Sequence, residues 1–554
     1  MKTNRMWCAT TLLCLSLVLW FVDCDKSTQL YPTAVDTAVE SRALSKNGVA
    51  VSVSSSADVI VNATSDIVDF AGVQEIGDLP GPDGLVTLRE AIIAANNSSG
   101  PQVIGFNIPI ADPGFDGVAF TIRPLSPLPG LWSGGTTING ATQSEFSGDT
   151  NEKGPEIVID GSLLDPTVEI TGLDVGSAFN WIHGLVVCGF SNGIDICGES
   201  SIGNVVTGCF IGTDVSGMSA RPNRQYGITS RFGASNTRIG GYGEEDRNLI
   251  SGTPHVGVFL EAETHDVIVQ GNLIGTDITG KYSIGNGSGI FCKANISQIF
   301  ILGNLVSGNT GDGMTITNGI VNMQIQGNLI GSDINGEPVL GNAACGLNFG
   351  AGDPLPPSHD ILVGGSLASE GNLIVDNGWG GIAIGGVAER IRVIGNTIYE
   401  NHGFGVLIDS PGLGNTIQCN RIFLNEALGI DLSGDGVTLN DTGDIDSGPN
   451  NLMNFPVLIS AKAAPGKLIV HGTVDTPNPK TVVIEFFANP VPTPGGDPSG
   501  FGEGAIFLGT AKPNPQGKFT AILPAVTKGT LISATATDAN GSTSEFAATI
   551  EAER

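Results

Sequence analysis

Basic residues are scarce in this chain of 554 residues. It holds 25 Lys and Arg against 55 Asp and Glu, which gives a formal net charge of -30. A surface this acidic repels phosphate backbones, and no stripe of Lys and Arg offsets the repulsion, so nucleic acid is not expected as a partner. Charged residues make up only 14% of the chain and aromatic residues 6%, which argues against a fold of amphipathic helices.

Several motifs of enzymes and metal proteins are also missing. The chain has no P-loop, no dinucleotide fingerprint, no nucleophile elbow and no HExxH pair. Its six histidines show no metal-ligand spacing, which argues against zinc or copper. Any catalytic site must therefore be assembled from residues that are distant in the sequence.

Long hydrophobic runs are limited to one near the start. Lys2 and Arg5 precede a mostly apolar run at residues 12–22, which is typical of an export signal and too short for a good membrane span. We predict a signal peptide at 1–23, a linker at 24–56, and a secreted or cell-surface protein without a transmembrane segment.

The end of this signal leaves one alternative open. Cys24 stands where a lipoprotein would be acylated, whereas Asp23 stands where a small residue is normally required. Export with a lipid anchor at Cys24 is therefore an alternative to release into the medium.

Glycine, by contrast, is abundant at 80 residues, and it marks an internal repeat. The segment GNLIGTD at 271–277 returns as GNLIGSD at 327–333 and as GCFIGTD at 208–214. An Asn before an apolar pair recurs at intervals of 24 residues, from 248 to 272, 304 to 328, 372 to 396 and 396 to 420. Such a period is typical of a solenoid in which each repeat forms one coil. We therefore predict an all-β parallel β-helix over 116–454, with Asn amides stacked from coil to coil.

Different patterns flank the repeat. On the N-terminal side, Thr87 and Glu90 form a capping box that opens a short helix, and residues 57–115 are predicted to be an N-terminal helical cap. On the C-terminal side, residues 455–554 switch to alternating strands separated by Pro and Gly turns, which indicates an Ig-like β-sandwich. Both segments would cover strand edges that otherwise invite aggregation.

Three segments together resemble a known group of proteins. They are Thr87-Leu-Arg-Glu-Ala-Ile with Ala94-Ala-Asn, the GNxIGTD coils, and SGPNNLMNFPVL at 447–458. Over nearly all of the chain after the predicted signal, these features are similar to secreted bacterial β-helix proteins of the "CSLREA" type, in the pectin-lyase-like superfamily, although Val86-Thr87 replaces the usual Cys-Ser. The resemblance implies a right-handed, single-stranded solenoid and export. It implies no activity, because the superfamily includes lyases, glycosidases, epimerases, esterases and adhesins.

One column of residues suggests a catalytic site. When the coils are aligned on the Gly that opens each second strand, Arg231, Glu261 and Lys293 fall in three consecutive coils, beside Phe259 and Phe291. A lyase acting on a uronic acid needs a cation for the carboxylate and a base for the adjacent proton. The three charged residues are therefore candidate catalytic residues, and the two phenyl rings are candidate sugar contacts. The alternative is a ladder of surface charges without catalysis.

A glycosidase would instead need two carboxylates about 5 to 9.5 Å apart, which neighbouring coils could supply. Asp409 and Asp431 lie in neighbouring coils, and Glu400 and Glu426 lie at nearly matching turn positions. The alternative for all four is that they are solvated acids on an acidic chain.

Further candidates for sugar contact are Trp379, Tyr399 and His402, which lie near turns of adjacent coils. Insertions after each IG[TS]D element are predicted to project from one edge as a wall beside a ligand. The alternative is that the Asp of each element only caps its own turn. The insertions are at 214–226, 277–288 and 333–345.

The segment where the solenoid ends is dense in oxygen ligands. Such ligands suit Ca²⁺, although their spacing is not that of an EF-hand loop. The alternative is a connector rich in Asx turns. The candidate calcium ligands are Asp435, Asn440, Asp441, Asp444 and Asp446.

The sequence thus leaves two classes of function open. We favour an exported, monomeric parallel β-helix protein that contacts a polysaccharide or a cell-surface glycan, with catalysis undecided. The alternatives are a polysaccharide lyase or glycoside hydrolase acting along the solenoid, and a structural adhesin-like rod.

Overall fold

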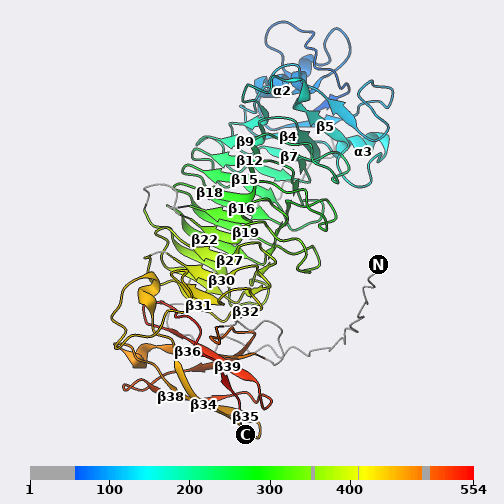
Figure 1. Ribbon diagram of the computed structural model, residues 1–554. Coiled ribbons are helices and arrows are strands. Elements are labelled where there is room, and N and C mark those ends of the chain that lie inside the picture. Colours follow the sequence, from blue (N-terminus) through cyan, green and yellow to red (C-terminus); the bar gives the residue numbers. More distant parts are fainter. Residues whose placement is uncertain (1–56, 318, 351–355, 410, 490–498, 554) are drawn as a thin grey trace, which may run out of the picture.

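The computed structural model describes residues 57–317, 319–350, 356–409, 411–489 and 499–553. The predicted signal peptide, the linker and Cys24 lie outside these residues. The described chain forms a long β-helix with helix α2 at one end and a smaller β domain at the other (Figure 1). Within the described ranges, no helix is both long and apolar enough to cross a membrane.

The body of the molecule consists of three long parallel sheets, here named A, B and C. From β4 onward each coil contributes one strand to each sheet, so a strand pairs with the strand three elements later. The twelve strands of sheet A are β1 (Val59–Val61), β2 (Gln102–Phe106), β4 (Thr136–Asn139), β7 (Trp181–His183), β10 (Val205–Thr207), β13 (Arg238–Gly240), β16 (His265–Gln270), β19 (Ser297–Leu302), β22 (Val321–Gln326), β25 (His359–Gly364), β28 (Ile391–Ile394) and β31 (Thr416–Gln418).

Sheet B is built from shorter strands. Its eleven strands are β3 (Phe120–Ile122), β5 (Ile157–Asp160), β8 (Leu185–Cys188), β11 (Phe210–Ile211), β14 (Leu249–Ile250), β17 (Leu273–Ile274), β20 (Leu305–Val306), β23 (Leu329–Ile330), β26 (Leu373–Val375), β29 (Thr397–Tyr399) and β32 (Arg421–Phe423).

Sheet C carries the candidate site. Its ten strands are β6 (Thr171–Val175), β9 (Asn192–Cys197), β12 (Tyr226–Arg231), β15 (Val256–Glu261), β18 (Ser288–Lys293), β21 (Met314–Ile316), β24 (Cys345–Phe349), β27 (Gly380–Ile384), β30 (Phe404–Ile408) and β33 (Ile430–Leu432).

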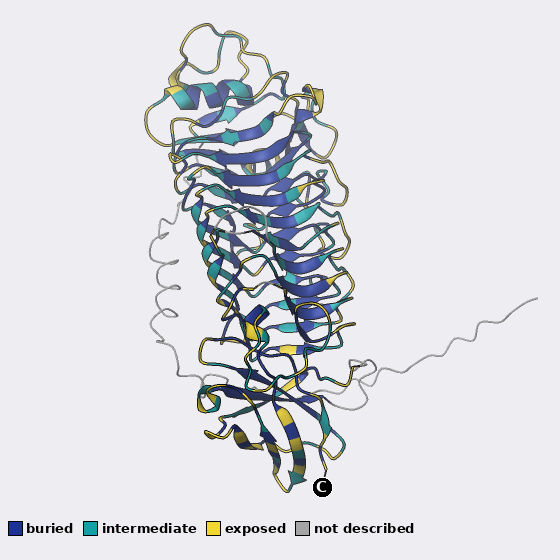
Figure 2. Ribbon diagram, turned by 60° about the vertical axis from the view of Figure 1, so that its left-hand side comes forward, coloured by how far each residue is buried: buried dark blue, intermediate teal, exposed yellow. Residues whose placement is uncertain are grey.

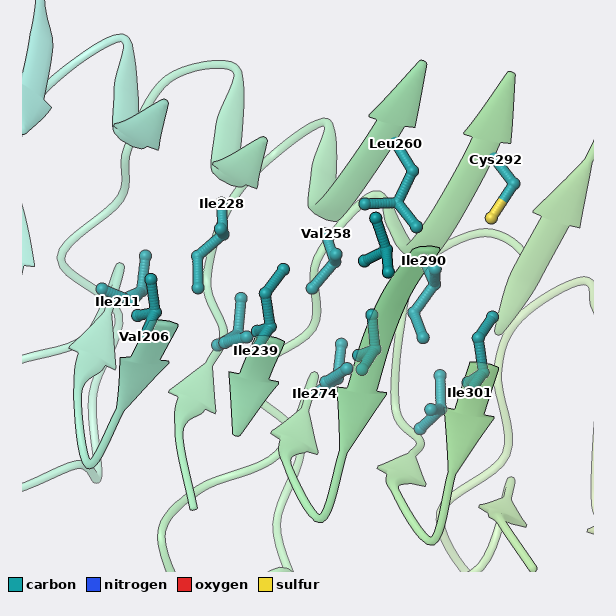
Figure 3. Close-up of a cluster of buried hydrophobic side chains, with 14 of the residues drawn as sticks. Val206, Ile211, Ile228, Ile239, Val258, Leu260, Ile274, Ile290, Cys292 and Ile301 are labelled. Atoms are coloured by element: carbon teal, nitrogen blue, oxygen red, sulfur yellow. The ribbon is translucent and has the colours of Figure 1, made fainter. Parts of the chain in front are cut away.

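The core of the β-helix is made of aliphatic columns. Ile228, Val258 and Ile290 are register partners on β12, β15 and β18, and all three are fully buried. Figure 3 shows these side chains facing those of sheets A and B across the interior. Because a single coil cannot bury its apolar side chains alone, stacking of coils supplies the stability, as the repeat predicts.

The predicted column of Asn amides is confirmed at the corner between sheets A and B. The amide of Asn272 donates to the side-chain oxygen of Asn304, and Asn304 donates to Asn328, each at 3.0 Å. These side chains are buried, so each hydrogen bond between two amides offsets the free-energy cost of removing those polar groups from water. A second ladder, absent from the prediction, lies at the corner between sheets B and C and contains Asn286, Asn309, Asn342, Asn377, Asn401 and Asn425.

Helix α2 (Leu88–Asn97) starts at the predicted capping box. The Thr87 hydroxyl accepts from the Glu90 backbone N–H, and a Glu90 carboxylate oxygen accepts from the Thr87 N–H. Leu88 and Ile92 belong to the same buried core as the strands, so this helix is packed on the first coils. The other short helices among the described residues are η2 (Ile76–Asp78), α3 (Thr142–Ser147), η3 (Gly161–Leu163), η4 (Pro449–Leu452) and η5 (Pro479–Thr481).

The C-terminal domain has two antiparallel sheets with a core of their own. Buried and exposed residues alternate along its strand β38 (Lys518–Leu523), whereas its strand β36 (Val483–Asn489) is buried throughout (Figure 2). One sheet contains β34 (Val457–Ala464), β35 (Lys467–Thr473) and β38 (Lys518–Leu523). The other contains β36 (Val483–Asn489), β37 (Ile506–Ala511), β39 (Leu531–Thr537) and β40 (Ile550–Glu551).

Three buried glutamates of this domain bind the last coils of the β-helix. Their carboxylates accept hydrogen bonds from backbone N–H groups at the end of the β-helix, where no further coil follows to accept them. Glu485 accepts from Cys419, Glu503 from Leu424 and Asn425, and Glu545 from Leu432 and Thr438. Burial raises the pKa of Glu485 and of Glu545 to about 7. The backbone N–H groups at the end of the solenoid therefore find their hydrogen-bond acceptors in acidic side chains of another domain.

Candidate functional site

The aligned residues of the sequence prediction lie on the outer face of sheet C. Phe259 is the register partner of Phe291, and Glu261 is the partner of Lys293. Arg231 ends the preceding strand, β12. Among the described residues, neither Glu261 nor Lys293 makes an ion pair within 4.0 Å. The five residues therefore gather on one face, but the charges do not form the ladder of ion pairs that was the alternative to a catalytic site.

Arg231 binds Asp195 instead. Its Nη2 lies 2.5 Å from Asp195 Oδ2, and its Nε donates to Oδ1 at 3.0 Å. The Thr229 hydroxyl donates to the same carboxylate. Asp195 is nearly covered, with 6% of its side chain exposed, against 21% for Arg231. Asp195 therefore accepts three hydrogen bonds, two of them from the Arg231 guanidinium.

Asp174 is the register partner of Asp195 on the neighbouring strand. The flanking Leu173 and Val175 are core residues, so the Asp174 carboxyl points outward on the same face as Asp195. Among the described residues no hydrogen bond reaches it. Burial raises the pKa of Asp174, and repulsion by Asp195 adds to the rise, which Arg231 partly offsets.

Two carboxyl groups thus stand side by side in different environments. Parallel strands lie about 4.8 Å apart. Asp195 is hydrogen-bonded by Arg231, whereas burial raises the pKa of Asp174. Two carboxyl groups in such different surroundings can divide the roles of acid and base.

Asp174 is not among the residues predicted from the sequence, although a signal for it was present. Gly172-Leu-Asp174 and Gly193-Ile-Asp195 repeat the same pattern in successive coils. Extending the column that contains Asp195 by one coil would have found the pair. The signal was weak because Gly429-Ile-Asp431 shows the same pattern far from this site.

The aromatic residues of this face are packed against one another. Tyr226, which the sequence analysis did not select, stacks on Phe259 with ring centroids 4.5 Å apart, and Phe259 meets Phe291 at 5.7 Å. Phe259 is only 5% exposed, so it supports its neighbours more than it offers surface to a ligand. Tyr226 and Phe291 are half-buried.

The other predicted sugar contacts lie on later coils. Trp379 is 59% exposed and meets the edge of Phe404 at 6.1 Å. Tyr399 stacks on Phe423 at 4.9 Å on the outer face of sheet B. Tyr399 therefore does not share the sheet that carries Asp174, whereas Trp379 lies beside later strands of that sheet, many coils from Asp174.

His402 lies at the corner between sheets B and C, where it makes two ion pairs. Its Nδ1 is 3.0 Å from Glu426 Oε1, and its Nε2 is 3.2 Å from Asp376 Oδ1. The hydrogen bond with Glu426, and then that with Asp376, raises the pKa of His402. Because both ring nitrogens are engaged, a sugar hydroxyl would have to displace a carboxylate.

The carboxylates predicted for a glycosidase do not occupy matching strand positions. Asp431 is the register partner of Leu407, so Asp409 lies in a different column. Glu426 is engaged by His402, and Glu400 sits in a left-handed turn at φ 52°. Two carboxyl groups at matching positions of neighbouring strands are found at Asp174 and Asp195 instead.

The candidate calcium ligands divide into two groups. Asp441, Asp444 and Asp446 come together, with one carboxylate oxygen of each within 4.8 Å of the others. Burial, together with the charges of Asp446 and Asp441, raises the pKa of Asp444 to about 6. The amide of Asn440 is used by the backbone of Phe455, on both its donor and acceptor sides.

Asp435 is absent from this cluster of three carboxylates. The calcium prediction therefore narrows to Asp441, Asp444 and Asp446, whose repulsion a cation would relieve.

The three insertions fold back over sheet B. Val215, Ile278 and Ile334 of successive insertions pack on the outer apolar side chains of that sheet. The Asp that opens each insertion caps its own turn, as when Asp277 accepts from the Lys281 and Tyr282 N–H groups. The insertions therefore stack with the coils. The capped turn at Asp277 agrees with the alternative interpretation, in which the Asp of each element only caps its own turn.

No protein-family model matches this chain. Among solved structures, a tailspike protein of E. coli bacteriophage HK620 in complex with a hexasaccharide matches at 13% identity and a TM-score of 0.38, over 82% of this chain and 91% of that chain. The periplasmic alginate epimerase AlgG matches at 14% identity and a TM-score of 0.28, over 64% and 72%. The A-module of the Azotobacter vinelandii mannuronan C-5 epimerase AlgE6 matches at 15% identity and a TM-score of 0.32, over 62% and 74%.

Proposed function

We propose that this protein binds a polysaccharide on the outer face of sheet C and hydrolyses a glycosidic bond there with Asp174 and Asp195. The observation that supports the proposal is the register of these two carboxyl groups, of which Arg231 and Thr229 hold only Asp195. Glycosidases use one carboxyl group as proton donor and a second as nucleophile or base.

The environments assign the roles. Asp174, whose pKa is raised by burial, donates its proton to the oxygen of the leaving sugar. The Asp195 carboxylate attacks the anomeric carbon as the glycosidic bond breaks, and forms an ester. Asp174, now charged, removes a proton from water, which hydrolyses the ester and restores both groups. A strand spacing of about 4.8 Å suits this retaining reaction better than the wider separation of inverting enzymes.

The lyase alternative loses part of its support. Arg231 is engaged by Asp195, so it is not available as the base for a sugar proton. Lys293 remains, two strands away from the bound guanidinium. The structural rod is the second alternative, and it predicts neither binding nor turnover.

The wider setting follows the sequence predictions. The apolar run at 12–22 supports export to the cell surface or the medium, with Cys24 as an alternative anchor. Helix α2 is positioned to cap a right-handed solenoid, and the two C-terminal sheets form a sandwich of Ig-like type at its other end. The protein acts as a monomer.

The test is release of products from a panel of neutral and uronic polysaccharides. New reducing ends that disappear in Asp174→Asn would support the hydrolase, whereas new ultraviolet absorbance from unsaturated sugars that disappears in Lys293→Ala would support the lyase. Absence of both products from every polysaccharide would refute the proposed catalysis.

A further inference from the structure

Trp132 is an exposed tryptophan on the strand position next to the carboxyl pair. Leu131 bridges Val175 of β6, and its N–H donates to the carbonyl oxygen of Asp174 at 2.8 Å. Leu131 is buried in the core, so Trp132 points outward, on the face that carries Asp174. The indole remains 58% exposed.

The indole lies flat against backbone that has no side chains. A Cβ atom added at Gly176 would lie 1.9 Å from the ring, and one added at Gly130 would lie 2.5 Å from it. Both glycines are therefore needed to admit the ring. One face of the indole is against the chain, and the exposed fraction belongs to the opposite face, as in a platform on which a sugar ring can stack.

Helix α2 fixes the backbone of this segment. The side-chain oxygen of Asn96 accepts from the N–H groups of Trp132 and Ser133 at 2.9 and 3.3 Å, and its amide donates to the Gly130 carbonyl at 2.8 Å. Three hydrogen bonds from one side chain hold the platform in place. Ordering a sugar on a platform that is already fixed costs less free energy than ordering a mobile loop.

The charges around the platform indicate the class of sugar. Asp174, Asp195 and Glu261 place carboxyl groups on this face. Arg231 is paired with Asp195, and Arg224 is hydrogen-bonded to the Ser191 hydroxyl and the Val168 carbonyl. Lys293, the register partner of Glu261, makes no ion pair among the described residues, but it lies two strands beyond Arg231 and therefore far from Asp174. The net charge of -30 also disfavours an anionic sugar at this position.

We propose that Trp132 is the sugar-stacking residue of this site and that the bound polysaccharide is neutral. This inference rests on the proposed function, because it places the platform beside the proposed catalytic pair. Trp132 is a specificity residue that holds the sugar next to Asp174, and it takes no part in proton transfer.

The test measures binding and turnover separately. Affinities of the full chain for cellohexaose, xylohexaose and mannohexaose, and for hexagalacturonate and hexamannuronate, are measured by calorimetry alongside reducing-end release. At least one neutral hexasaccharide is expected to bind more tightly than either uronate. Trp132→Ala should weaken that binding roughly tenfold, a loss of about 1.4 kcal/mol, while Trp132→Phe retains part of it. Tyr242→Ala removes an aromatic that is 83% exposed elsewhere and serves as the matched control.

The outcomes separate the two proposals. Equal binding by wild type and Trp132→Ala, or a preference for uronates, overturns the inference even if neutral sugars are cleaved. Weakened binding in Trp132→Ala without any cleavage by the wild type supports the platform and removes the hydrolase. No binding of any of the five hexasaccharides overturns both. Thermal unfolding of each variant shows whether a loss reflects misfolding.

Discussion

Asp174 and Asp195 are register partners on neighbouring strands, yet only Asp195 receives hydrogen bonds from neighbouring side chains. Two chemically identical groups about one strand spacing apart are thus set to different tasks by what lies beside them. The predictions below test this relationship and the features of the fold that hold it in place.

Removal of either carboxyl group should abolish hydrolysis without removing the sugar contacts. We expect Asp174→Asn and Asp195→Asn each to lower the rate of reducing-end release by at least about 100-fold, since general acid catalysis alone contributes on that order. Affinity for an uncleaved oligosaccharide should change by less than threefold, roughly half a unit on a logarithmic scale. The exposed Glu145→Gln on α3 is the control, and an equal loss in that variant would contradict the assignment.

Removal of the Arg231 side chain should leave a buried charge without its partner. Because Asp195 is almost covered, Arg231→Met is expected to lower the free energy of unfolding by about 2 to 3 kcal/mol. Adding Asp195→Asn to this variant should recover part of the loss, since the unpaired charge is then gone. Chemical denaturation of the single and double variants measures the difference. Additive losses would argue against the ion pair as the cause.

Stability should fall as the pH rises from about 4.5 to 7. Burial raises the folded pKa of Glu485 and Glu545 to about 7, above the ordinary value of about 4.3 in the unfolded chain. The folded state therefore binds protons more tightly. The contribution of each group is full below about pH 4.3 and is lost as the pH approaches 7, on the order of 4 kcal/mol each.

Thermal unfolding between pH 4 and pH 8 checks this dependence, and Glu545→Gln should flatten it. The nearby charge of Asp431 also contributes to the raised pKa of Glu545. The exposed Glu551→Gln keeps the same change in net charge and should leave the slope unaltered. A slope that is the same in both variants would trace the effect to the overall charge of the chain.

The Asn ladder should be costly to interrupt. Asn328 is fully buried and donates to Asn372 and to the Ile301 carbonyl, both at 2.9 Å. Asn328→Ala removes the side-chain donor of these two hydrogen bonds and the acceptor for the Asn304 side-chain amide, and we expect a loss of about 2 to 4 kcal/mol in denaturation experiments. Gln516→Ala, an exposed amide, is the comparison. A loss below about 0.5 kcal/mol, which is typical of surface changes, would show that water replaces the amide.

Calcium should stabilise the end of the β-helix if the three gathered carboxylates bind it. We expect millimolar calcium to raise the thermal midpoint and a chelator to lower it, with both effects lost in Asp444→Asn. An unchanged midpoint in calcium and in chelator would leave these residues as a connector.

Several features were predictable because they depend on short-range patterns. The 24-residue spacing placed Asn304 and Asn328 in one ladder, and Thr87 with Glu90 marked the start of α2. The register of Phe259 with Phe291 also followed from counting residues after a glycine. In a parallel stack each coil repeats the backbone of the one before, so position in the repeat determines position in the sheet.

The choice of Asp195 over Glu261 by Arg231 did not follow from such counting. Both acids lie one strand away from the arginine. A repeat fixes the position of a residue's Cα and Cβ atoms but not the conformation that places its charged group. The same limit hid Trp132, which reaches the face from a loop outside the regular coils and is held there by Asn96. The sequence by itself determined the stack of coils, because its period specifies the backbone. Only the tertiary structure decided which side chains meet on the face of sheet C, because those contacts depend on directions and loops that no period encodes.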